Sequence, residues 1–219
     1  MDALEAIRRR RSVRRYTDAP VADADLDRLL RLALMAPTGG MSQSWSMIVV
    51  REPEKRAELA ELVIRGGADY FGFVRPQAEG TSDEEQHQWA TGYAEKVLES
   101  YRRVPVWVVM LLVPRPGTYP EDRGDEARTA DMISVGMMAE NLFVAARAMG
   151  LGTVPTVFHW FYEKQFRAML NVPDEVEIPV ITPLGYPEEW PEGLPPALAS
   201  IRRPWRTLVH DEAWGSPRA

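Results

Sequence analysis

Apolar side chains recur at helical spacing along much of this chain. Between residues 23 and 36, leucine and alanine follow one another at intervals of three and four positions, and Pro37 ends the pattern. A similar pattern over residues 54–64 predicts a helix that ends at Gly66-Gly67. Further helices are expected over residues 2–10, 83–103, 128–149 and 163–170.

Two of these expected helices carry a clear burial pattern. The helix over residues 2–10 begins at Asp2, a favourable N-cap, and its Leu4 and Ile7 are spaced for one buried stripe. The helix over residues 128–149 is apolar on most of its circumference. It is therefore expected to be deeply buried, either in a core or against another subunit.

Three short apolar runs predict strands, over residues 45–51, 105–113 and 178–184. The middle run is continuously apolar, so that strand is expected to be covered on both faces at the centre of a sheet. Strands and helices do not alternate strictly, which favours an α+β fold, a sheet with helices packed on it, over a doubly wound fold. No repeat or linker divides the chain, so residues 1–219 are expected to form a single domain.

Two segments follow neither period. Residues 66–82 keep aromatic side chains without regular spacing, which is typical either of a lid over a binding site or of a disordered insertion. The final residues, 190–219, are rich in proline and tryptophan and predict an extended C-terminal arm.

The composition narrows the class of protein. Of the 219 residues 45% are hydrophobic and 26% charged, as in ordinary globular proteins, and the net charge of -6 argues against nucleic acid or anionic membranes as partners. Without cysteine the chain has no disulfide, thiol nucleophile or thiolate metal site. No apolar run is long enough to span a membrane and the start does not read as a secretory signal, so a cytoplasmic location is predicted.

A cluster of arginines stands out against this acidic background. Arg10, Arg11, Ser12 and Arg14 lie where the first helix is expected to end and an extended stretch to begin. Guanidinium groups are well suited to a phosphate monoester, because they donate paired, charge-assisted hydrogen bonds. In an extended chain Arg10, Ser12 and Arg14 would share one side. The alternative interpretation is a solvated basic patch that balances nearby carboxylates.

Two small-residue segments could approach a flat ligand. In residues 37–45, Gly39 and Gly40 remove side chains from a turn between helix and strand, and Gln43 offers both a donor and an acceptor to a heterocycle. Residues 150–157 follow the long helix and could bring main chain against one face of a ligand. Each segment is also explained as a plain connection between a helix and a strand.

Other kinds of site find no support in the sequence. The three histidines lack metal-ligand spacing, so no metal is expected. The chain has no nucleophile elbow, no P-loop and no glycine-rich dinucleotide fingerprint after a strand. Because no acid, base or nucleophile stands out, a bound cofactor is the natural carrier of any chemistry.

The order of the motifs resembles the FMN-dependent nitroreductase family. Residues 10–14 are similar to its opening R-R-S-x-R, and residues 36–45 to its A-P-S-x-x-N-x-Q-P-W. Further along, residues 150–155 resemble G-L-G…P, residues 183–187 P-x-G-Y-P and residues 202–204 the terminal R-K-P. The likeness covers roughly residues 2 to 206. Each motif is short, but five in the correct order are specific.

The resemblance implies an α+β fold with a central, mainly antiparallel sheet flanked by helices, in an intertwined homodimer with two FMN molecules at its interface. It implies that the phosphate and ribityl end of FMN is held by Arg10, Arg11, Ser12 and Arg14, together with Arg202 or Arg203 of the arm. The partner subunit would contribute Pro37, Thr38, Gly39, Met41 and Gln43. The ring near its reactive nitrogen would be lined by Pro155, Thr156 and Val157.

The activity that the resemblance implies is two-electron transfer from NADH or NADPH to nitroaromatics, quinones or similar electron-poor acceptors in a ping-pong cycle. Two other hypotheses stay open: a flavoprotein of the same fold with a narrower reaction, such as dehalogenation or flavin breakdown, and a flavin-free protein that binds a phosphorylated ligand. An ordered lid within residues 66–103, the region that shapes substrate choice in this family, would favour the narrower reaction.

Some positions depart from the family pattern or stay unassigned. Met41 replaces the usual asparagine and Ser44 the usual proline, so one polar contact to the flavin is expected to be missing and the turn to be less rigid. No residue is assigned as catalytic. Arg75 is a candidate for the positive charge near the pyrimidine edge of the ring.

Overall fold

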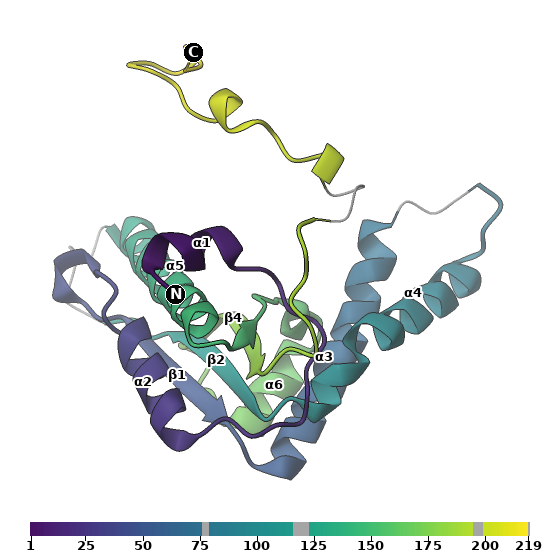
Figure 1. Cartoon of the computed structure of the whole chain (residues 1–219). Helices are drawn as coiled ribbons and strands as arrows, with labels where there is room; N and C mark the ends of the chain where they lie inside the picture. Colours follow the sequence, from purple (N-terminus) through teal and green to yellow (C-terminus); the bar gives the residue numbers. More distant parts are fainter. Residues whose placement is uncertain (76–78, 116–122, 195–198, 219) are drawn as a thin grey trace.

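A four-stranded antiparallel sheet forms the centre of the fold (Figure 1). The computed structural model describes residues 1–75, 79–115, 123–194 and 199–218. The strands are β1 (Trp45–Val50), β2 (Val106–Leu112), β3 (Gly152–Thr153) and β4 (Glu177–Gly185), in the order β1-β2-β4-β3. Every residue of β2 is buried, which confirms the prediction of a central strand covered on both faces.

The side chains of β2 alternate between two hydrophobic clusters. Val106, Val108, Met110 and Leu112 face the cluster that includes the helices α2 (Asp23–Ala33) and α5 (Gly124–Ala148). Trp107, Val109 and Leu111 face the other cluster, which is covered by the helices α3 (Pro53–Val74), α4 (Asp83–Leu98) and α6 (Glu163–Leu170). The period of two in the strand thus divides the core into two layers. The predicted α+β class, a sheet flanked by helices, is confirmed.

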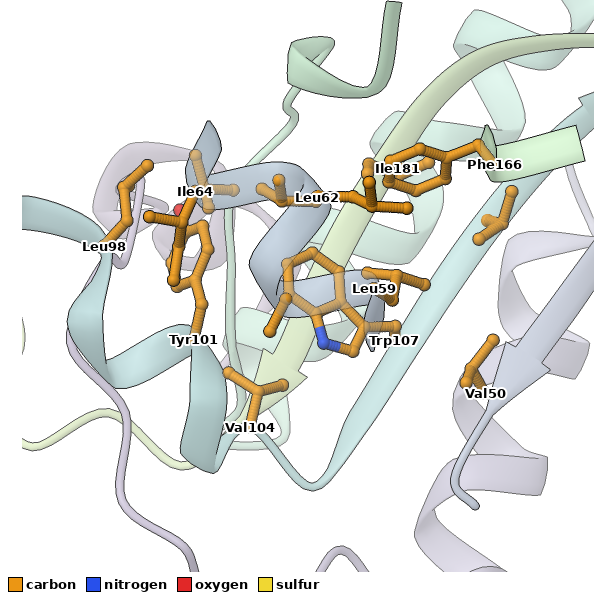
Figure 2. Close-up of a cluster of buried hydrophobic side chains, with 14 of the residues drawn as sticks. Val50, Leu59, Leu62, Ile64, Leu98, Tyr101, Val104, Trp107, Phe166 and Ile181 are labelled. Carbon is orange, nitrogen blue, oxygen red and sulfur yellow. The ribbon is translucent and has the colours of Figure 1, made fainter. Parts of the chain in front are cut away.

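Trp107 lies at the centre of the second cluster. Figure 2 shows its indole among Leu59 and Leu62 of α3, with Tyr101 and Val104 beside it. Tyr101 meets Trp107 edge to face, with ring centroids 5.4 Å apart. Large aromatic side chains fix this layer, which lies on the far side of the sheet from α5.

The prediction that residues 54–64 form a helix ended by glycines is wrong, because α3 continues through Gly66 and Gly67 to Val74. A Cβ atom on Gly66 would lie 2.0 Å from the carbonyl oxygen of Phe158, and one on Gly67 2.5 Å from Leu98. The two glycines therefore allow neighbouring segments to pack against the helix and do not end it. The disordered alternative is likewise wrong for residues 66–74, whereas residues 76–78 lie outside the described part of the chain.

The remaining predicted elements differ mainly at their ends. The helix expected over residues 83–103 gives way after Leu98 to a 3-10 turn, η2 (Glu99–Arg103). The long helix α5 begins four residues earlier than expected. The described residues contain three further 3-10 turns, η1 (Gly39–Met41), η4 (Phe158–Tyr162) and η5 (Trp205–Thr207). The 163–170 prediction is confirmed by α6.

The first helix, α1 (Ala3–Arg9), has its N-cap where expected, since Asp2 accepts a hydrogen bond from the Glu5 amide at 2.8 Å. Its predicted buried stripe is wrong, because Leu4 and Ile7 are 81% and 59% exposed. Only Ala6 of α1 is buried, and the helix that α1 packs against is α5. The apolar face of α1 therefore points away from this chain's core.

The last described residues, 199–218, extend away from the sheet and its helices (Figure 1). Their side chains are exposed apart from His210, which is half-buried against Trp214. Within the described ranges, no helix has both the length and the apolar composition that a membrane span requires.

Candidate functional site

Residues 10–14, which we call the arginine segment, run from the end of α1 along β3. The helix ends because Arg10 leaves helical geometry, with φ -58° and ψ 131°. Ser12 then forms a parallel bridge with Thr153, and the Val13 amide donates to the Thr153 carbonyl at 3.0 Å. A Cβ atom on Gly152 would lie 2.9 Å from the Val13 side chain, so the bare glycine permits this approach. The fold thus brings two of the sequence motifs, residues 10–14 and 150–155, side by side.

An open cleft of about 970 Å³ lies over this segment. It is lined by four of the predicted residues, Arg10, Arg11, Ser12 and Arg14, and by Arg202 from the far end of the chain. Arg203 does not line the cleft. Of the two alternatives in the arm, Arg202 and Arg203, the cleft therefore includes only Arg202. Pro191 and Leu194 add an apolar wall, and Glu189 adds one carboxylate.

The half-buried arginines at this cleft are held in place before any ligand arrives. The Nη1 atom of Arg11 donates to the carbonyls of Arg8 and Arg10, at 2.9 and 2.8 Å. The Nε atom of Arg10 lies 3.5 Å from Glu140 on α5. Guanidinium groups oriented in this way lose little freedom when they bind an anion.

The backbone that follows is anchored from below. Ser100 donates its hydroxyl to the Arg14 carbonyl at 3.0 Å and accepts the Tyr16 amide at 3.1 Å. Burial raises the pKa of Tyr16 well above its ordinary value, so its hydroxyl stays protonated and donates to the Val13 carbonyl at 2.8 Å. These bonds lock the segment whose side chains line the cleft.

A further positive charge lies behind this segment. Arg147, in the last turn of α5, places its guanidinium 3.4 Å above the centre of the Trp190 ring. Burial, and then the charges of Arg9 and Arg11, lower the pKa of Arg147. Arg9 and Arg11 thus lie near enough to act on Arg147, and this gathering of positive charge favours an anion beside the segment.

The turn at residues 37–43 is fixed to α5 by polar contacts. The Gly39 amide donates to Ser134 Oγ at 3.4 Å, and the buried Ser42 hydroxyl lies 3.1 Å from the buried Asp131 carboxylate. Thr38 Oγ1 accepts the Gln43 amide at 3.2 Å, which closes the turn on itself. The turn is therefore more rigid than the missing proline at position 44 predicts.

The backbone of this turn is strained. Gly40, Met41 and Gln43 have φ angles of 55°, 58° and 47°. Left-handed geometry costs about 1 kcal/mol at non-glycine residues. Met41 and Gln43 nevertheless adopt it, and both side chains are exposed, Met41 by 76%. The turn thus presents these two side chains outward and makes no use of them within the chain's own core.

The structure does not bring this turn to the arginine cleft. None of residues 37–43 lines the cleft. The turn meets α5 at Ser134, whereas Arg10 meets the same helix at Glu140, six residues later. At 1.5 Å per residue the two points lie about 9 Å apart along the axis. The two halves of the predicted site are therefore separate within one chain.

The third predicted group continues directly from β3. Thr156 is buried and exchanges backbone hydrogen bonds with Ile181, at 3.0 and 3.1 Å. Pro155 is exposed and Val157 half-buried. None of the three lines the cleft, although they follow within a few residues of the strand beside it.

Arg75, the candidate for the positive charge near the ring edge, packs against an aromatic side chain of α4. Its guanidinium lies 3.8 Å above the centre of the Trp89 ring, and its carbonyl accepts a hydrogen bond from Gln86 at 3.1 Å. Trp89 in turn stacks on Tyr93, at 5.2 Å between centroids. These contacts join the end of α3 to α4.

Several residues that position the site carry no motif in the sequence. Ser100 and Glu140 act through the arginine segment, and Asp131 and Ser134 through the turn. One signal could have found the last two, because polar residues three positions apart interrupt an otherwise apolar helix. Among the described residues, no cluster of histidine or carboxylate side chains could hold a metal ion.

The cleft fits the phosphate end of FMN. Its donor set is cationic, partly pre-oriented and completed by the hydroxyl of Ser12, as a phosphate monoester requires. Its volume lies at the upper end of the range for small-molecule sites. The planar ring has no matching cradle in the same cleft, which agrees with the separate position of residues 37–43.

The fold and this cleft define an α+β protein with a strongly basic binding site. The model of the Nitroreductase family matches residues 7–186, and the chain therefore belongs to the nitroreductase family of flavin-associated oxidoreductases. The family resemblance of the sequence motifs is thus confirmed.

Similar curated proteins carry several names. The chain is 30% identical over 219 residues to an NADH dehydrogenase of Thermus thermophilus, covering 93% of this chain and 94% of that one. It is 26% identical over 216 residues to the NADPH-flavin oxidoreductase of Vibrio harveyi, covering 97% and 75%. It is 25% identical over 182 residues to an iodotyrosine deiodinase of Thermotoga neapolitana, covering 83% and 87%.

Solved structures share the fold. NfrA2 of B. megaterium superposes with a TM-score of 0.72 at 21% identity, covering 98% of this chain and 76% of that one. The Vibrio harveyi NADPH:FMN oxidoreductase complexed with NAD+ gives 0.70 at 21% identity, covering 99% and 79%. An iodotyrosine deiodinase bound to FMN and 3-iodo-L-tyrosine gives 0.65 at 20% identity, covering 89% and 94%.

Proposed function

We propose that this chain is an FMN-dependent NAD(P)H oxidoreductase that reduces nitroaromatics, quinones or similar electron-poor acceptors. The observation that carries the proposal is the meeting of Arg10, Arg11, Ser12, Arg14 and Arg202 in one cleft beside β3. Family membership supports it, because the four N-terminal residues lie within the matched range 7–186, and Arg202 resembles the family's terminal motif beyond that range.

The residues divide the work of holding the cofactor. Arg10 and Arg11, already oriented, would neutralise the phosphate, with Arg202 closing over it from the arm. Ser12 and Arg14 would donate to the phosphate and ribityl oxygens. The chemistry that FMN supplies when bound is two-electron transfer from NADH or NADPH to an acceptor in a ping-pong cycle.

The flavin ring needs residues that lie elsewhere. Pro155, Thr156 and Val157 would line it from the same subunit as the arginines. Pro37, Thr38, Gly39, Met41 and Gln43 would reach it from a second copy, because they lie apart from the cleft within one chain. Positioning the ring, excluding water from it and orienting its ligands are then shared between two subunits.

The exposed apolar surface supports a homodimer. Leu4 of α1, Ile133 of α5 and Trp205 of the arm are all more than half exposed. β1 lies at the edge of the sheet, where it presents unpaired backbone groups, and the arm extends away from its own subunit. Surfaces of this kind are typical of an interface in which two copies exchange their arms.

The proteins that share the fold and sequence support the choice of cofactor and donor. One relative is named NADPH-flavin oxidoreductase, and a structure of that enzyme class is complexed with NAD+. The expected cytoplasmic location and the absence of nucleic acid or membrane partners stay predictions.

The visible absorption spectrum of the purified protein tests the proposal. A yellow protein that loses its flavin absorption when NADPH or NADH is added without oxygen would support it. A yellow protein that no nicotinamide reduces would contradict the proposed electron donor. A colourless protein that takes up no added FMN would contradict the flavin site and favour a flavin-free phospholigand protein.

Reductive dehalogenation is a second candidate function. It is favoured by three deiodinase matches, one of them a structure bound to FMN and an iodinated tyrosine. In the ordered α3–α4 pair Tyr93 contacts the rings of both Phe71 and Trp89, which gives an aromatic surface for a phenol. Iodide release from 3-iodotyrosine, measured beside nitroaromatic reduction on the same preparation, distinguishes the two activities.

A further inference from the structure

The cleft holds more positive charge than one phosphate requires. Six arginines line it. Four of them, Arg10, Arg11, Arg14 and Arg202, are already proposed for FMN, and the other two are Arg8 and Arg15. Two carboxylates oppose them, Glu189 in the lining and Glu140 beside Arg10. Six guanidinium groups against two carboxylates leave a formal excess of four. A phosphate monoester carries up to about two negative charges near neutral pH, so about half of the excess has no partner.

The arginines fall into an inner and an outer set. Arg10 and Arg11 are half-buried and bonded to Glu140 and to backbone carbonyls. Arg8 and Arg15 are exposed and belong to the solvent-facing part of the lining, which we call the mouth of the cleft. Arg8 has only Glu5, at 3.9 Å, and Glu5 lies nearer to Arg9, at 2.9 Å. In the described part of the chain the Arg15 side chain makes no ion pair, although its carbonyl accepts the Glu188 amide.

The mouth of the cleft also carries apolar surface. Ile7 of α1 is 59% exposed there, and Pro191 and Leu194 face the same space from the start of the arm. Apolar side chains beside guanidinium groups suit a base joined to a phosphorylated sugar, because the base needs a flat apolar contact and the phosphate a cation. The combination fits an adenosine that carries its own phosphate.

We propose that Arg8 and Arg15 bind the 2′-phosphate of NADPH, and that the chain therefore uses NADPH in preference to NADH. The inference rests on the proposed function, since it concerns the electron donor of that same site. Ile7, Pro191 and Leu194 provide the contact for the adenine, while the inner arginines remain with FMN. NADPH and NADH differ by this one phosphate. Guanidinium groups at the mouth that no carboxylate among the described residues fully neutralises therefore raise the affinity for NADPH above that for NADH.

Equilibrium binding to the FMN-loaded protein tests the inference without turnover. Calorimetric titration with NADP+ and NAD+ is expected to show NADP+ binding at least about tenfold more tightly, as a charge-assisted contact provides. Titration with 2′,5′-ADP and 3′,5′-ADP tests whether the position of the phosphate on the ribose matters, because both ligands carry two phosphates and differ only in that position. Equal affinity within either pair of ligands would overturn the inference.

Single substitutions assign the effect to the two residues. Arg8→Gln and Arg15→Gln are each expected to reduce the NADP+/NAD+ affinity ratio about fivefold, a value discounted for exposure. Arg9→Gln is the matched control, since Arg9 lies on the same helix, is exposed and does not line the cleft. Its ratio should stay within about twofold. An unchanged ratio in both cleft variants would overturn the assignment.

Flavin content keeps the two proposals apart. Each variant is expected to retain FMN, measured by its absorption after gel filtration, because Arg8 and Arg15 are not assigned to the cofactor. A protein that binds FMN but does not distinguish the nucleotides would overturn this inference alone. Failure to bind FMN at all would instead overturn the proposed function on which it rests.

Discussion

The arginine segment and the turn at residues 37–43 are both held to α5, yet they meet it about two turns apart. The first lies beside β3, points its side chains into a cleft and is joined there by Arg202. The second is equally well anchored, through Ser42 and Asp131, but directs Met41 and Gln43 outward. The first region holds most of the residues proposed for the cofactor, and the second lies apart from them. This separation is what the proposed homodimer predicts, since a second copy would then supply the turn.

The largest expected effect comes from removing the inner charges. Arg10→Ala combined with Arg14→Ala should weaken FMN binding on the order of 100-fold or more, because each removes a charge-assisted contact worth about 1.5–3 kcal/mol. Folding should persist, since neither side chain is buried. FMN content and circular dichroism measure the two properties. Arg28→Ala with Arg31→Ala removes two exposed arginines of α2 and is the control for the loss of two positive charges. Full FMN occupancy in the Arg10→Ala, Arg14→Ala protein would contradict the proposed phosphate site.

Mixing two defective chains sharpens the comparison directly. A variant with the arginine defect and a variant with Thr38→Ala and Gln43→Ala would be refolded together. If the two half-sites belong to different copies, heterodimers regain one intact site, and about a quarter of all sites should bind FMN. If each site is built within one chain, mixing should restore none.

Acid should unfold the protein through a residue that belongs to neither region. His159 is fully buried, and its Nε2 donates to the Ile178 carbonyl at 2.8 Å. Its Nδ1 has no hydrogen-bond partner among the described residues. Burial lowers the pKa of His159 to about 4, from an ordinary value of 6.5. The unfolded chain therefore binds the proton first, so stability should fall as pH drops from about 6.5 to 4, by up to about 3 kcal/mol. Urea unfolding midpoints across this pH range measure the loss of stability. The His159→Gln protein should show a weaker dependence on pH. An equally steep dependence in that variant would show that another group causes it.

Breaking the contact between the arginine segment and β3 should have an intermediate effect. Gly152→Ala places a methyl group 2.9 Å from Val13, so the segment must shift. We expect a loss of about 1–3 kcal/mol in stability and about tenfold weaker FMN binding. Urea unfolding and flavin titration measure both. Gly92→Ala, where nothing lies within 4 Å, is the matched substitution and should be neutral or slightly stabilising.

The smallest effect is expected at the turn. Ser42→Ala removes the partner of the buried Asp131 carboxylate and should cost about 1–2 kcal/mol. Because we propose that the turn serves a second copy, the FMN content of the Ser42→Ala protein should fall together with the concentration of dimer. It should not follow the fraction of folded monomer. Ser46→Ala on β1, where the side chain is exposed, is the control. A stability change no larger than that of Ser46→Ala would show that the anchor to α5 is unimportant.

Helices and strands whose apolar residues follow a clear spacing could be predicted from the sequence. Features that depend on what packs against a residue could not. The continuous apolar run of β2 and the helical spacing of leucines in α2 identify both elements, although α2 ends at Ala33 and not at the expected residue 36. Gly66 and Gly67 are misleading, because a glycine that ends a helix and one that allows close packing are identical in sequence. Leu4 and Ile7 are misleading for a similar reason, since an apolar stripe left exposed on a helix has the same period as one that faces the core.

The sequence by itself determined the α+β class, the family and the four N-terminal residues that line the cleft, because these depend on local periodicity and on short motifs. Only the tertiary structure decided that Arg202 lines this cleft, that Gly152 lets the arginine segment lie against β3, and that residues 37–43 lie apart from both. Such relations join positions far apart in the chain. They depend on which faces of the sheet and of α5 are covered, and no local pattern of residues encodes that choice.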